Sequence, residues 1–317
     1  MKYRKLGGSG LDVSVVGLGT NNFGGRTDYP TTESVIGKTI DEGINFIDTA
    51  DFYGGRGKSE EFIGQAVQAL KARQKVLLAT KVSGPMGEGP NMKGNSRHHI
   101  MNGVEGSLRR LQTDHIDLYQ IHYADDATPI EETLRALDDL VRQGKVRYIG
   151  CSNFMAWQVA EAIWTSRDLN LNAFVSVQPQ YNMLSREVER ELLPFCQKYR
   201  VGVIPYSPLA GGFLTGKYRR GAQAPQGTRY AGNTQMQQRM FTDRNFGLIE
   251  RLNTFATEHG HTLAELAIAW LLGHPDVSTV ISGATKPGQV TENAKAAAWE
   301  LSTAEMMSIN ALLDPRD

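Results

Sequence analysis

Short apolar, β-branched runs alternate with longer amphipathic segments along almost the whole chain. The runs are nearly continuous in hydrophobic residues, which is typical of parallel strands that are buried on both faces. Before them, residues 3–6 and 13–16 flank a Gly-Gly-Ser-Gly turn and predict an opening β-hairpin. The eight strand candidates are Val15–Thr20, Ile44–Asp48, Val76–Lys81, Ile116–His122, Val146–Ser152, Phe174–Gln178, Val201–Tyr206 and Ser278–Ser282.

The segments between the strands carry helix start and stop signals. Thr31-Thr32-Glu33 predicts one helix start, and Gly43 predicts its end just before the second strand. Ser96 is a candidate N-cap of another helix, and Thr128-Pro129 reads as a cap followed by a proline at the first helical position. Strands therefore alternate with helices, as in an α/β protein.

The spacing of the strands indicates how many units the chain contains. The first seven runs begin about 27 to 40 residues apart, and the eighth begins about 77 residues after the seventh. Eight βα units favour a single (β/α)₈ TIM barrel over residues 1–317, with a doubly wound open sheet as the alternative. The long interval predicts a functional loop after the seventh strand, residues 209–243, and residues 302–317 form a helical tail.

Composition and charge exclude several classes of protein. The 317 residues include 34 Lys and Arg against 34 Asp and Glu, and a net charge of zero argues against binding nucleic acid. No apolar segment is long enough to span a membrane, and Met1–Lys5 is basic without the apolar stretch of a signal peptide. Two cysteines, Cys151 and Cys196, show no metal-ligand spacing, so we expect no metal site and a cytoplasmic location.

Polar residues stand where the predicted strands end. Asp48, Lys81 and His122 close the second, third and fourth strands, and Tyr53 follows in the second βα loop. Taken singly, each has an ordinary structural explanation, such as a turn cap or a solvated lysine. A barrel brings the carboxyl ends of its strands together at one face, so the four are expected to converge there. Further polar ends are Thr20-Asn21-Asn22, Ser152-Asn153, Gln178 and Tyr206-Ser207.

These four side chains suit proton transfer to a carbonyl oxygen. Tyrosine is a weak acid whose reference pKa is about 10, and an adjacent ammonium group eases loss of its proton. Lys81 is expected to supply that charge, Asp48 to hold Lys81, and His122 to orient the carbonyl. The set lacks an electron source, so we expect the protein to bind a cofactor that supplies the electrons.

Two glycine-containing segments are candidates for that cofactor site. Gly17–Asn22 nearly matches G-x-G-x-x-G, but Asn22 stands at the third glycine and no helix follows at once, so we reject a Rossmann fingerprint. Residues 281–289 instead run from the last strand through a small-residue turn into a helix, which matches the phosphate site usual in barrels, and Lys286 adds charge.

With these motifs the chain resembles an aldo-keto reductase over nearly its whole length. Its pattern is that of a bacterial-type member, related to the reductases that resemble potassium-channel β-subunits. The segments that carry the resemblance are Gly43–Gly54, Ile149–Phe154, Gln178–Asn182 and Tyr206–Leu209. The resemblance implies a (β/α)₈ barrel that binds NADPH without a Rossmann domain. It also implies a catalytic tetrad of Asp48, Tyr53, Lys81 and His122, with Tyr53 donating the proton.

The resemblance further implies which residues contact the cofactor, with NADPH or NADP favoured and NADH as the less favoured option. The matched positions are Thr20, Asn21, Asp48, Ser152, Asn153, Gln178, Tyr206, Ser207, Pro208, Leu209, Gly211, Lys217, Arg229, Gly283, Thr285, Gln289, Glu292 and Asn293. Of these, Thr285 and Gln289 would lie near the 2′-phosphate. The implied partner is a small-molecule carbonyl, and a homo-oligomer is compatible with the pattern.

The substrate side departs from the family pattern. Asn22, Phe52 and Tyr123 are the candidate substrate contacts, and two carboxylates, Asp125 and Asp126, follow Tyr123. The amides and carboxylates suggest a polar, hydroxylated carbonyl as substrate. Two other functions stay open: a cofactor-binding regulatory subunit or sensor like the channel β-subunits, which differ at the histidine position, and a Schiff-base lyase that uses Lys81.

Overall fold

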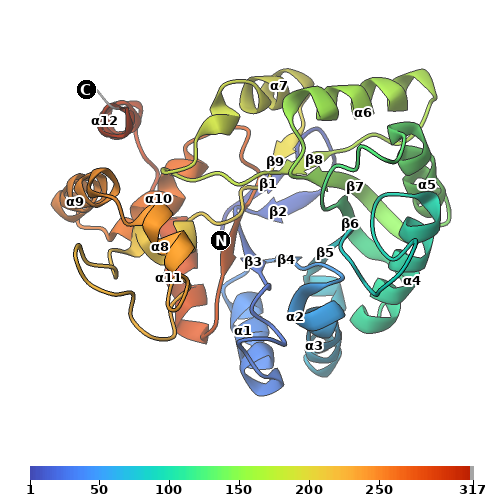
Figure 1. Cartoon of the computed structure of the whole chain (residues 1–317), viewed down its shortest axis with the longest axis horizontal. Coiled ribbons are helices and arrows are strands. Elements are labelled where there is room, and N and C mark those ends of the chain that lie inside the picture. Colours follow the sequence, from blue (N-terminus) through green and yellow to red (C-terminus); the bar gives the residue numbers. More distant parts are fainter. Residues whose placement is uncertain (315–317) are drawn as a thin grey trace.

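The computed structural model describes residues 1–314, in which eight parallel strands form the centre of the molecule (Figure 1). Their order in the sheet is β10-β3-β4-β5-β6-β7-β8-β9, so neighbours in the chain are neighbours in the sheet. The strands are β3 (Val16–Gly19), β4 (Phe46–Asp48), β5 (Leu77–Val82), β6 (Ile116–Ile121), β7 (Val146–Ser152), β8 (Ser176–Gln178), β9 (Gly202–Val203) and β10 (Val280–Gly283).

The two ends of this sheet meet and close it. Val203 pairs in parallel with Val277, and Tyr206 pairs with Ile281. The amide of Ile281 donates to the carbonyl of Pro205 at 2.9 Å, which is the bond that joins β10 to the chain beyond β9. The predicted (β/α)₈ barrel is therefore confirmed, and the open-sheet alternative is excluded.

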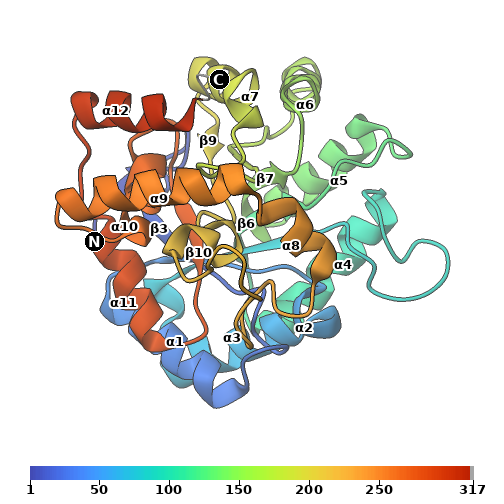
Figure 2. The same ribbon diagram turned by 60° about the vertical axis from the view of Figure 1, so that its left-hand side comes forward.

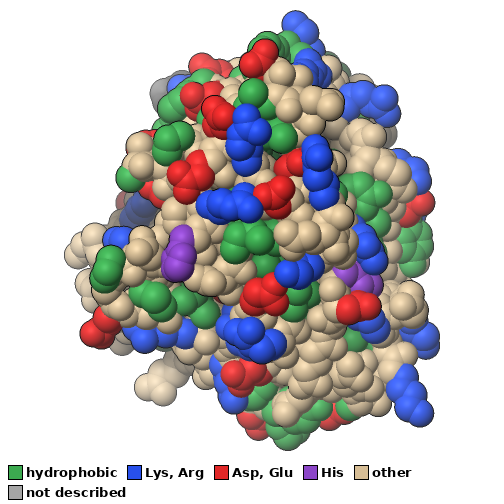
Figure 3. All heavy atoms as spheres, turned by 90° about the vertical axis from the view of Figure 1, so that its right-hand side faces the viewer, with side chains coloured by type: hydrophobic (Ala, Val, Ile, Leu, Met, Phe, Trp, Pro, Cys, Tyr) green, Lys and Arg blue, Asp and Glu red, His purple; other side chains and the backbone are tan. Residues whose placement is uncertain are grey.

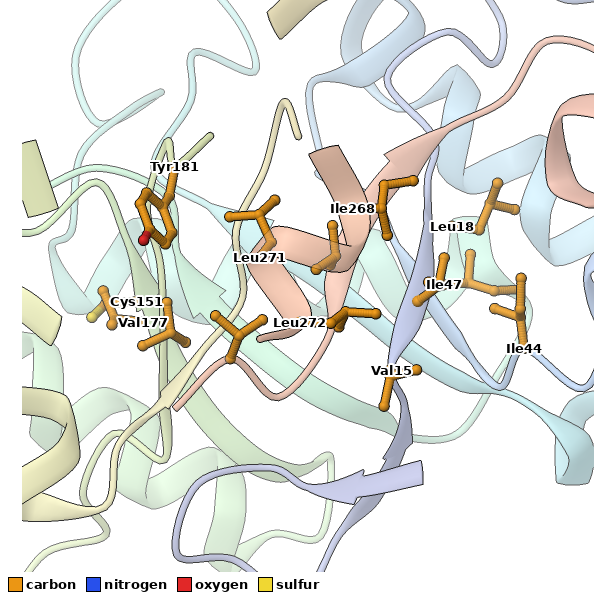
Figure 4. Close-up of a cluster of buried hydrophobic side chains, with 14 of the residues drawn as sticks. Val15, Leu18, Ile44, Ile47, Cys151, Val177, Tyr181, Ile268, Leu271 and Leu272 are labelled. Atoms are coloured by element: carbon orange, nitrogen blue, oxygen red, sulfur yellow. The ribbon is translucent and has the colours of Figure 1, made fainter. Parts of the chain in front are cut away.

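Helices follow the strands and cover the outside of the sheet (Figures 1 and 2). The helices that follow the strands in order are α1 (Tyr29–Asp41), α3 (Lys58–Ala69), α4 (Arg97–Leu111), α5 (Ile130–Arg142), α6 (Ala156–Asp168), α7 (Leu192–Tyr199), α10 (Leu263–Leu272) and α11 (Pro287–Ala296). The additional helical segments are α2 (Tyr53–Arg56), η1 (Arg73–Lys75), η2 (Glu187–Glu189), η3 (Ala210–Thr215), α8 (Thr234–Met240), α9 (Asp243–Glu258) and α12 (Thr303–Leu313). Their apolar faces and the outer faces of the strands form the main core, part of which Figure 4 shows with Leu18, Ile47, Ile268 and Leu271.

The hairpin predicted at the start of the chain is present and plugs the amino-terminal end of the barrel. It consists of β1 (Tyr3–Lys5) and β2 (Asp12–Ser14), which pair antiparallel. Leu6 and Val13 are fully buried in a cluster that also contains Leu118 from β6 and Ile204 just after β9. Apolar side chains therefore fill this end of the barrel, as in other barrels of this size.

The helix starts agree with the sequence in one case and differ in two. Ser96 is the N-cap of α4, and its hydroxyl accepts the His99 amide. The helix expected from Thr31 begins earlier, because the Asp28 side chain caps it and Tyr29 is its first residue. Thr128 is not an N-cap, since its hydroxyl donates to the Asp125 carboxylate at 2.8 Å and leaves α5 without a side-chain cap.

The long segment after β9 contains η3 and α8 before α9 begins, so it is less irregular than the sequence suggested (Figure 2). An aromatic cluster gives it a defined shape, with neighbouring ring centroids 5.2 to 6.0 Å apart. The Tyr230 hydroxyl also donates to the Ala210 carbonyl at 2.8 Å and so ties the two ends of the segment together. The cluster consists of Phe213, Tyr218, Tyr230, Phe241 and Phe246.

The predicted helical tail is α12, which Ser302 caps through a capping box with Glu305. Asp314 forms an ion pair with Arg186 at 2.9 Å, and residues 315–317 lie outside the described residues. On the face that carries α4, α5 and α6, positive and negative side chains are interspersed (Figure 3). This mixture agrees with the zero net charge of the chain.

Candidate active site

A buried ion pair lies at the carboxyl end of the barrel. Asp48 ends β4 and Lys81 lies near the end of the neighbouring strand β5, so parallel pairing brings the two side chains together. The Lys81 ammonium donates to Asp48 Oδ2 at 2.6 Å and to the Thr49 carbonyl at 2.8 Å. Burial acts to lower the pKa of Lys81, but the Asp48 carboxylate and the Tyr53 hydroxyl together raise that pKa above its usual value. Lys81 is therefore a fixed, enclosed cation.

The second oxygen of Asp48 accepts hydrogen bonds from two glutamine amides. Gln120 Nε2 lies 3.1 Å and Gln178 Nε2 lies 3.0 Å from Asp48 Oδ1. Gln178 was predicted from the sequence, whereas Gln120 was missed. The two-residue period of β6 could have found it, because Leu118 lies in the cluster inside the barrel and Gln120 is two residues further on the same side. With three hydrogen bonds in total, the Asp48 carboxylate is fixed and holds Lys81 in one position.

Tyr53 is the first residue of the short helix α2, and its ring centroid lies 5.2 Å from the Lys81 ammonium. Burial raises the pKa of Tyr53, and the neighbouring ammonium of Lys81 works in the opposite direction. The phenol thus carries its proton at neutral pH, while the adjacent cation stabilises the phenolate left after proton donation. This is the arrangement expected of a general acid.

His122 follows β6 and is 5% exposed. Its ring stacks on Phe52 at a centroid distance of 5.0 Å and on Tyr123 at 4.5 Å, with an interplanar angle of only 3° for Tyr123. Burial and the nearby Lys81 charge lower the pKa of His122 to about 2. A neutral imidazole, able to donate one N–H, therefore lies 5.8 Å from the Tyr53 ring, measured between centroids.

The residues expected to hold a nicotinamide lie beside this set. Tyr206 donates its hydroxyl proton to Asn153 Oδ1 at 2.8 Å, and Asn153 Nδ2 donates to the His122 carbonyl at 3.0 Å. Ser152 donates to the Gln178 carbonyl at 2.7 Å. These hydrogen bonds fix the ends of β7, β8 and the segment after β9 relative to His122.

The segment after β9 supplies the next group of predicted contacts. Ser207 is exposed in a left-handed backbone conformation, and Pro208 and Leu209 lead into η3. A side chain at Gly211 would approach the Tyr230 hydroxyl within 2.9 Å, so glycine is required for this turn. Burial, followed by the positive charge of Arg26, lowers the pKa of the Lys217 ammonium.

Arg26 is a second residue that the sequence reasoning missed. It lines a cavity of about 610 Å³ together with Thr285, which was predicted to lie near the 2′-phosphate. Within residues 1–314, neither Arg26 nor Lys217 has an ion-pair partner. Unpaired cations that converge in this way are suited to bind an anion.

The remaining predicted contacts are spread over the last βα unit. Gly283 ends β10, and Gln289 Oε1 accepts both the Thr285 amide at 2.7 Å and its hydroxyl at 3.2 Å. Glu292 is exposed on α11, and Asn293 beside it is buried. Arg229 is exposed in the segment after β9.

Three residues after β3 have different surroundings. Thr20 is buried, and its hydroxyl donates to the backbone carbonyl of Asp48 at 2.9 Å. Its side chain therefore helps to fix the backbone that carries the ion pair. Asn21 is exposed, whereas the Asn22 carbonyl accepts the amides of Arg26 and Thr27 in a turn. The structure therefore brings the four predicted tetrad residues together with the residues predicted to contact the nicotinamide. The Thr20 hydroxyl is already used in its bond to the Asp48 carbonyl.

Within residues 1–314, no helix combines the length and the apolar character needed to cross a membrane.

Comparisons with known proteins identify the family of the chain. Residues 15–314 match the family model described as the aldo/keto reductase family. A probable voltage-gated potassium channel subunit beta of Arabidopsis thaliana is 41% identical over 303 residues, which cover 93% of this chain and 91% of the relative. The uncharacterized oxidoreductase YrpG of Bacillus subtilis is 39% identical, with 93% of this chain and 91% of the relative covered. The aldo-keto reductase YhdN of Bacillus subtilis is 34% identical, with 99% and 94% covered. The chain belongs to the aldo/keto reductase family.

Proposed function

We propose that this protein reduces an aldehyde or ketone to the corresponding alcohol with NADPH, in a reversible reaction. The observation that carries the proposal is the grouping of Tyr53, the buried Lys81–Asp48 pair and the neutral His122 at one end of the barrel. A weak acid beside a fixed cation, next to an uncharged hydrogen-bond donor, is the set of groups that carbonyl reduction requires.

Each side chain has a distinct task in this proposal. Nicotinamide, when bound, supplies the hydride that adds to the carbonyl carbon. Tyr53 gives its proton to the carbonyl oxygen, and the Lys81 ammonium stabilises the phenolate that remains. His122 donates a hydrogen bond to the same oxygen and orients it. Asp48 holds Lys81 in place.

The residues present fit a phosphate-bearing cofactor. Ser152, Asn153 and Gln178 offer amide and hydroxyl groups beside Tyr206, whose ring is suited to stack on a nicotinamide. Lys217 and Arg26 are cations without carboxylate partners in the described part of the chain, which favours NADPH over NADH.

The substrate expectation changes with the structure. A polar, hydroxylated carbonyl was expected partly because two carboxylates follow Tyr123. The Asp125 carboxylate accepts bonds from the Asn95 amide, the Ala127 amide and the Thr128 hydroxyl, so only Asp126 remains exposed. We therefore propose an aldehyde or ketone without assigning it hydroxyl groups.

The proposal is tested by following NADPH oxidation with a panel of aldehydes and ketones, and by repeating the assay with NADH. We expect turnover with NADPH in the wild type. Tyr53→Phe should keep the NADPH dissociation constant within about twofold and lower kcat by at least about a hundredfold, because it removes the proton donor alone. Undiminished carbonyl reduction by this variant would refute the role of Tyr53.

A second candidate function is a cofactor-binding subunit with little turnover. The observation in its favour is the similarity to proteins named as probable potassium channel β-subunits. A single-turnover experiment distinguishes the two, because a regulatory subunit would bind NADPH tightly and oxidise it slowly with every carbonyl offered. The neutral His122 beside Tyr53 favours catalysis.

The lyase alternative fits the structure poorly. A Schiff-base lysine must lose its proton to attack a carbonyl. The pKa of Lys81 is raised, and its ammonium is fully buried against Asp48 and Thr49. Borohydride in the presence of a carbonyl substrate is therefore expected to leave Lys81 unmodified, as mass spectrometry of the peptide would show.

A further inference from the structure

Asn95 joins two loops at the mouth of the barrel. It lies just before α4, is 3% exposed, and has hydrogen bonds at every polar group. Its Oδ1 accepts from the Ser83 hydroxyl at 2.5 Å, and its Nδ2 donates to the Tyr123 carbonyl at 2.8 Å. Its amide donates to Asp125 Oδ2 at 2.9 Å, and its carbonyl accepts from the Thr133 hydroxyl at 2.9 Å. One residue thus ties the loop after β5 to the loop after β6.

The loop after β5 is held in a strained conformation at this joint. Ser83 has a φ of 134°, a value that residues with a side chain rarely adopt. Its hydroxyl also accepts the His122 amide at 3.2 Å. Gly94 has a φ of 92°, and a Cβ there would lie 2.8 Å from the Asp125 carboxylate. Strain of this kind persists where the surroundings determine the conformation, and it concentrates at functional sites.

The joint controls the aromatic rings beside His122. Asn95 holds the backbone of Tyr123, whose ring lies parallel to the imidazole at 4.5 Å and is 46% exposed. On the other loop, a Cβ at Gly84 would come within 2.2 Å of Phe52, so Phe52 rests directly on the backbone after β5. Both rings that stack on His122 are therefore placed by residues 83–95.

We propose that Asn95 is a positioning residue for the substrate. It holds Tyr123 against His122, and the exposed face of Tyr123 forms the wall on which the part of the substrate beyond its carbonyl group packs. This inference rests on the proposed function. It predicts a selective effect, since a substrate with an aromatic ring reaches this wall and a small aliphatic aldehyde does not.

The test uses Asn95→Asp, which keeps an acceptor for Ser83 and replaces the donor to the Tyr123 carbonyl with an oxygen. We expect KM for 4-nitrobenzaldehyde to rise about tenfold, KM for propanal to change less than about twofold, and kcat with either to stay within about threefold. The dissociation constant of NADPH should not change. Equal changes in KM for both aldehydes would overturn the proposal.

Two further variants separate positioning from general destabilisation. Thr133→Val removes a bond at the same joint without touching the loop after β6, and it should leave both KM values unchanged. In a Tyr123→Ala background, Asn95→Asp should add little to KM for 4-nitrobenzaldehyde, because the wall is already absent. Additive effects of the two substitutions would contradict the proposal. If Asn95→Asp does not fold, Asn95→Ser replaces it, since the shorter side chain also loses the bond to the Tyr123 carbonyl.

Amide hydrogen exchange, compared between the wild type and Asn95→Asp, measures how firmly the two loops are held and does not depend on enzyme turnover. Faster exchange in both 84–95 and 121–128 is expected, and faster exchange in 84–95 alone would overturn the inference. A wild type that reduces no aldehyde or ketone of the panel would instead refute the proposed function, so the two failures are distinguishable.

Discussion

At the scale of single residues, the candidate site joins titratable side chains, such as Asp48 and Lys81, to amides such as Gln120 that hold them in place. Asp48, Lys81 and His122 were found because each stands at the end of an apolar run. Gln120 lies within a run, so only the two-residue period of the strand marks it as facing the inside of the barrel, where it lies 3.1 Å from Asp48. Asn95 could not be predicted because its partners lie 12 and 28 residues away in the chain.

Asp51 is a buried residue from which a pH dependence of stability follows. It is 0% exposed, and within residues 1–314 neither of its carboxyl oxygens has a hydrogen-bond partner. Burial, and then the nearby carboxylate of Glu60, raises the pKa of Asp51 to about 8 from 3.8. Arg110 lowers this pKa by a smaller amount. Asp51 is therefore protonated in the folded protein at neutral pH.

Between about pH 4 and pH 8, the unfolded chain releases the Asp51 proton and the folded protein keeps it. The free energy of unfolding should thus fall as the pH rises through this window. Asp51→Asn, which resembles the protonated form, should flatten that decline relative to the wild type in urea unfolding at pH 5, 7 and 8.5. The matched control is Asp126→Asn, an exposed position, which should run parallel to the wild type. If the free energy of unfolding of Asp51→Asn fell with pH as steeply as that of the wild type, the raised pKa assigned to Asp51 would be contradicted.

At the scale of elements, the strand pattern was predictable and the boundaries were less so. The run 201–206 predicted a full strand, but β9 covers only Gly202–Val203. Pro205 has no amide proton to give, and its carbonyl instead accepts the Ile281 amide across the closure of the barrel. Thr128 was expected to cap α5, yet a carboxylate three residues earlier competes for its hydroxyl. A proline inside the run shortened the strand in the first case, and in the second a nearby carboxylate bound the hydroxyl of the expected cap.

The segment after β9 allows a prediction about the cofactor. Tyr230→Phe removes the bond from the hydroxyl to the Ala210 carbonyl and keeps the aromatic cluster. The loss of about 1 kcal/mol should weaken NADPH binding several-fold and speed its release, with KM for the carbonyl unchanged. Fluorescence titration and stopped-flow release measure both quantities. The control is Tyr199→Phe on α7, which should bind NADPH as the wild type does. If Tyr230→Phe and Tyr199→Phe bound NADPH with equal affinity, the bond from Tyr230 to Ala210 would not hold the segment in place.

At the scale of the whole molecule, the apolar cluster of the hairpin and the polar candidate site lie at opposite ends of one barrel. The hairpin and its apolar side chains fill the amino-terminal end, and the polar site occupies the carboxyl end. This separation is general for (β/α)₈ barrels, in which loops can vary without disturbing the core. The fold class was therefore predictable from the pattern of strands and helices, whereas the substrate was not, because the loops around the site are held by side-chain contacts between segments far apart in the chain.

Leu6→Ala tests this separation. Leu6 is 0% exposed inside the barrel, so its truncation should lower the free energy of unfolding by about 2–5 kcal/mol. At 25 °C, kcat and KM should stay at their wild-type values, since the change is remote from Tyr53. Leu70→Ala is the control at a 38% exposed leucine and should cost far less. A loss of activity in folded Leu6→Ala would show that the plug and the site are coupled.

The hairpin also has a practical consequence for handling the protein. Because it places Met1 and Lys2 at the end of the barrel opposite the site, an affinity tag, a fluorophore or a surface linkage at the amino terminus leaves the barrel mouth accessible. The Lys2 side chain is half exposed and, within residues 1–314, its ammonium forms an ion pair only with the exposed Glu300, so the attachment point lies at the surface. Immobilisation through this end would present every molecule with its mouth toward the solution.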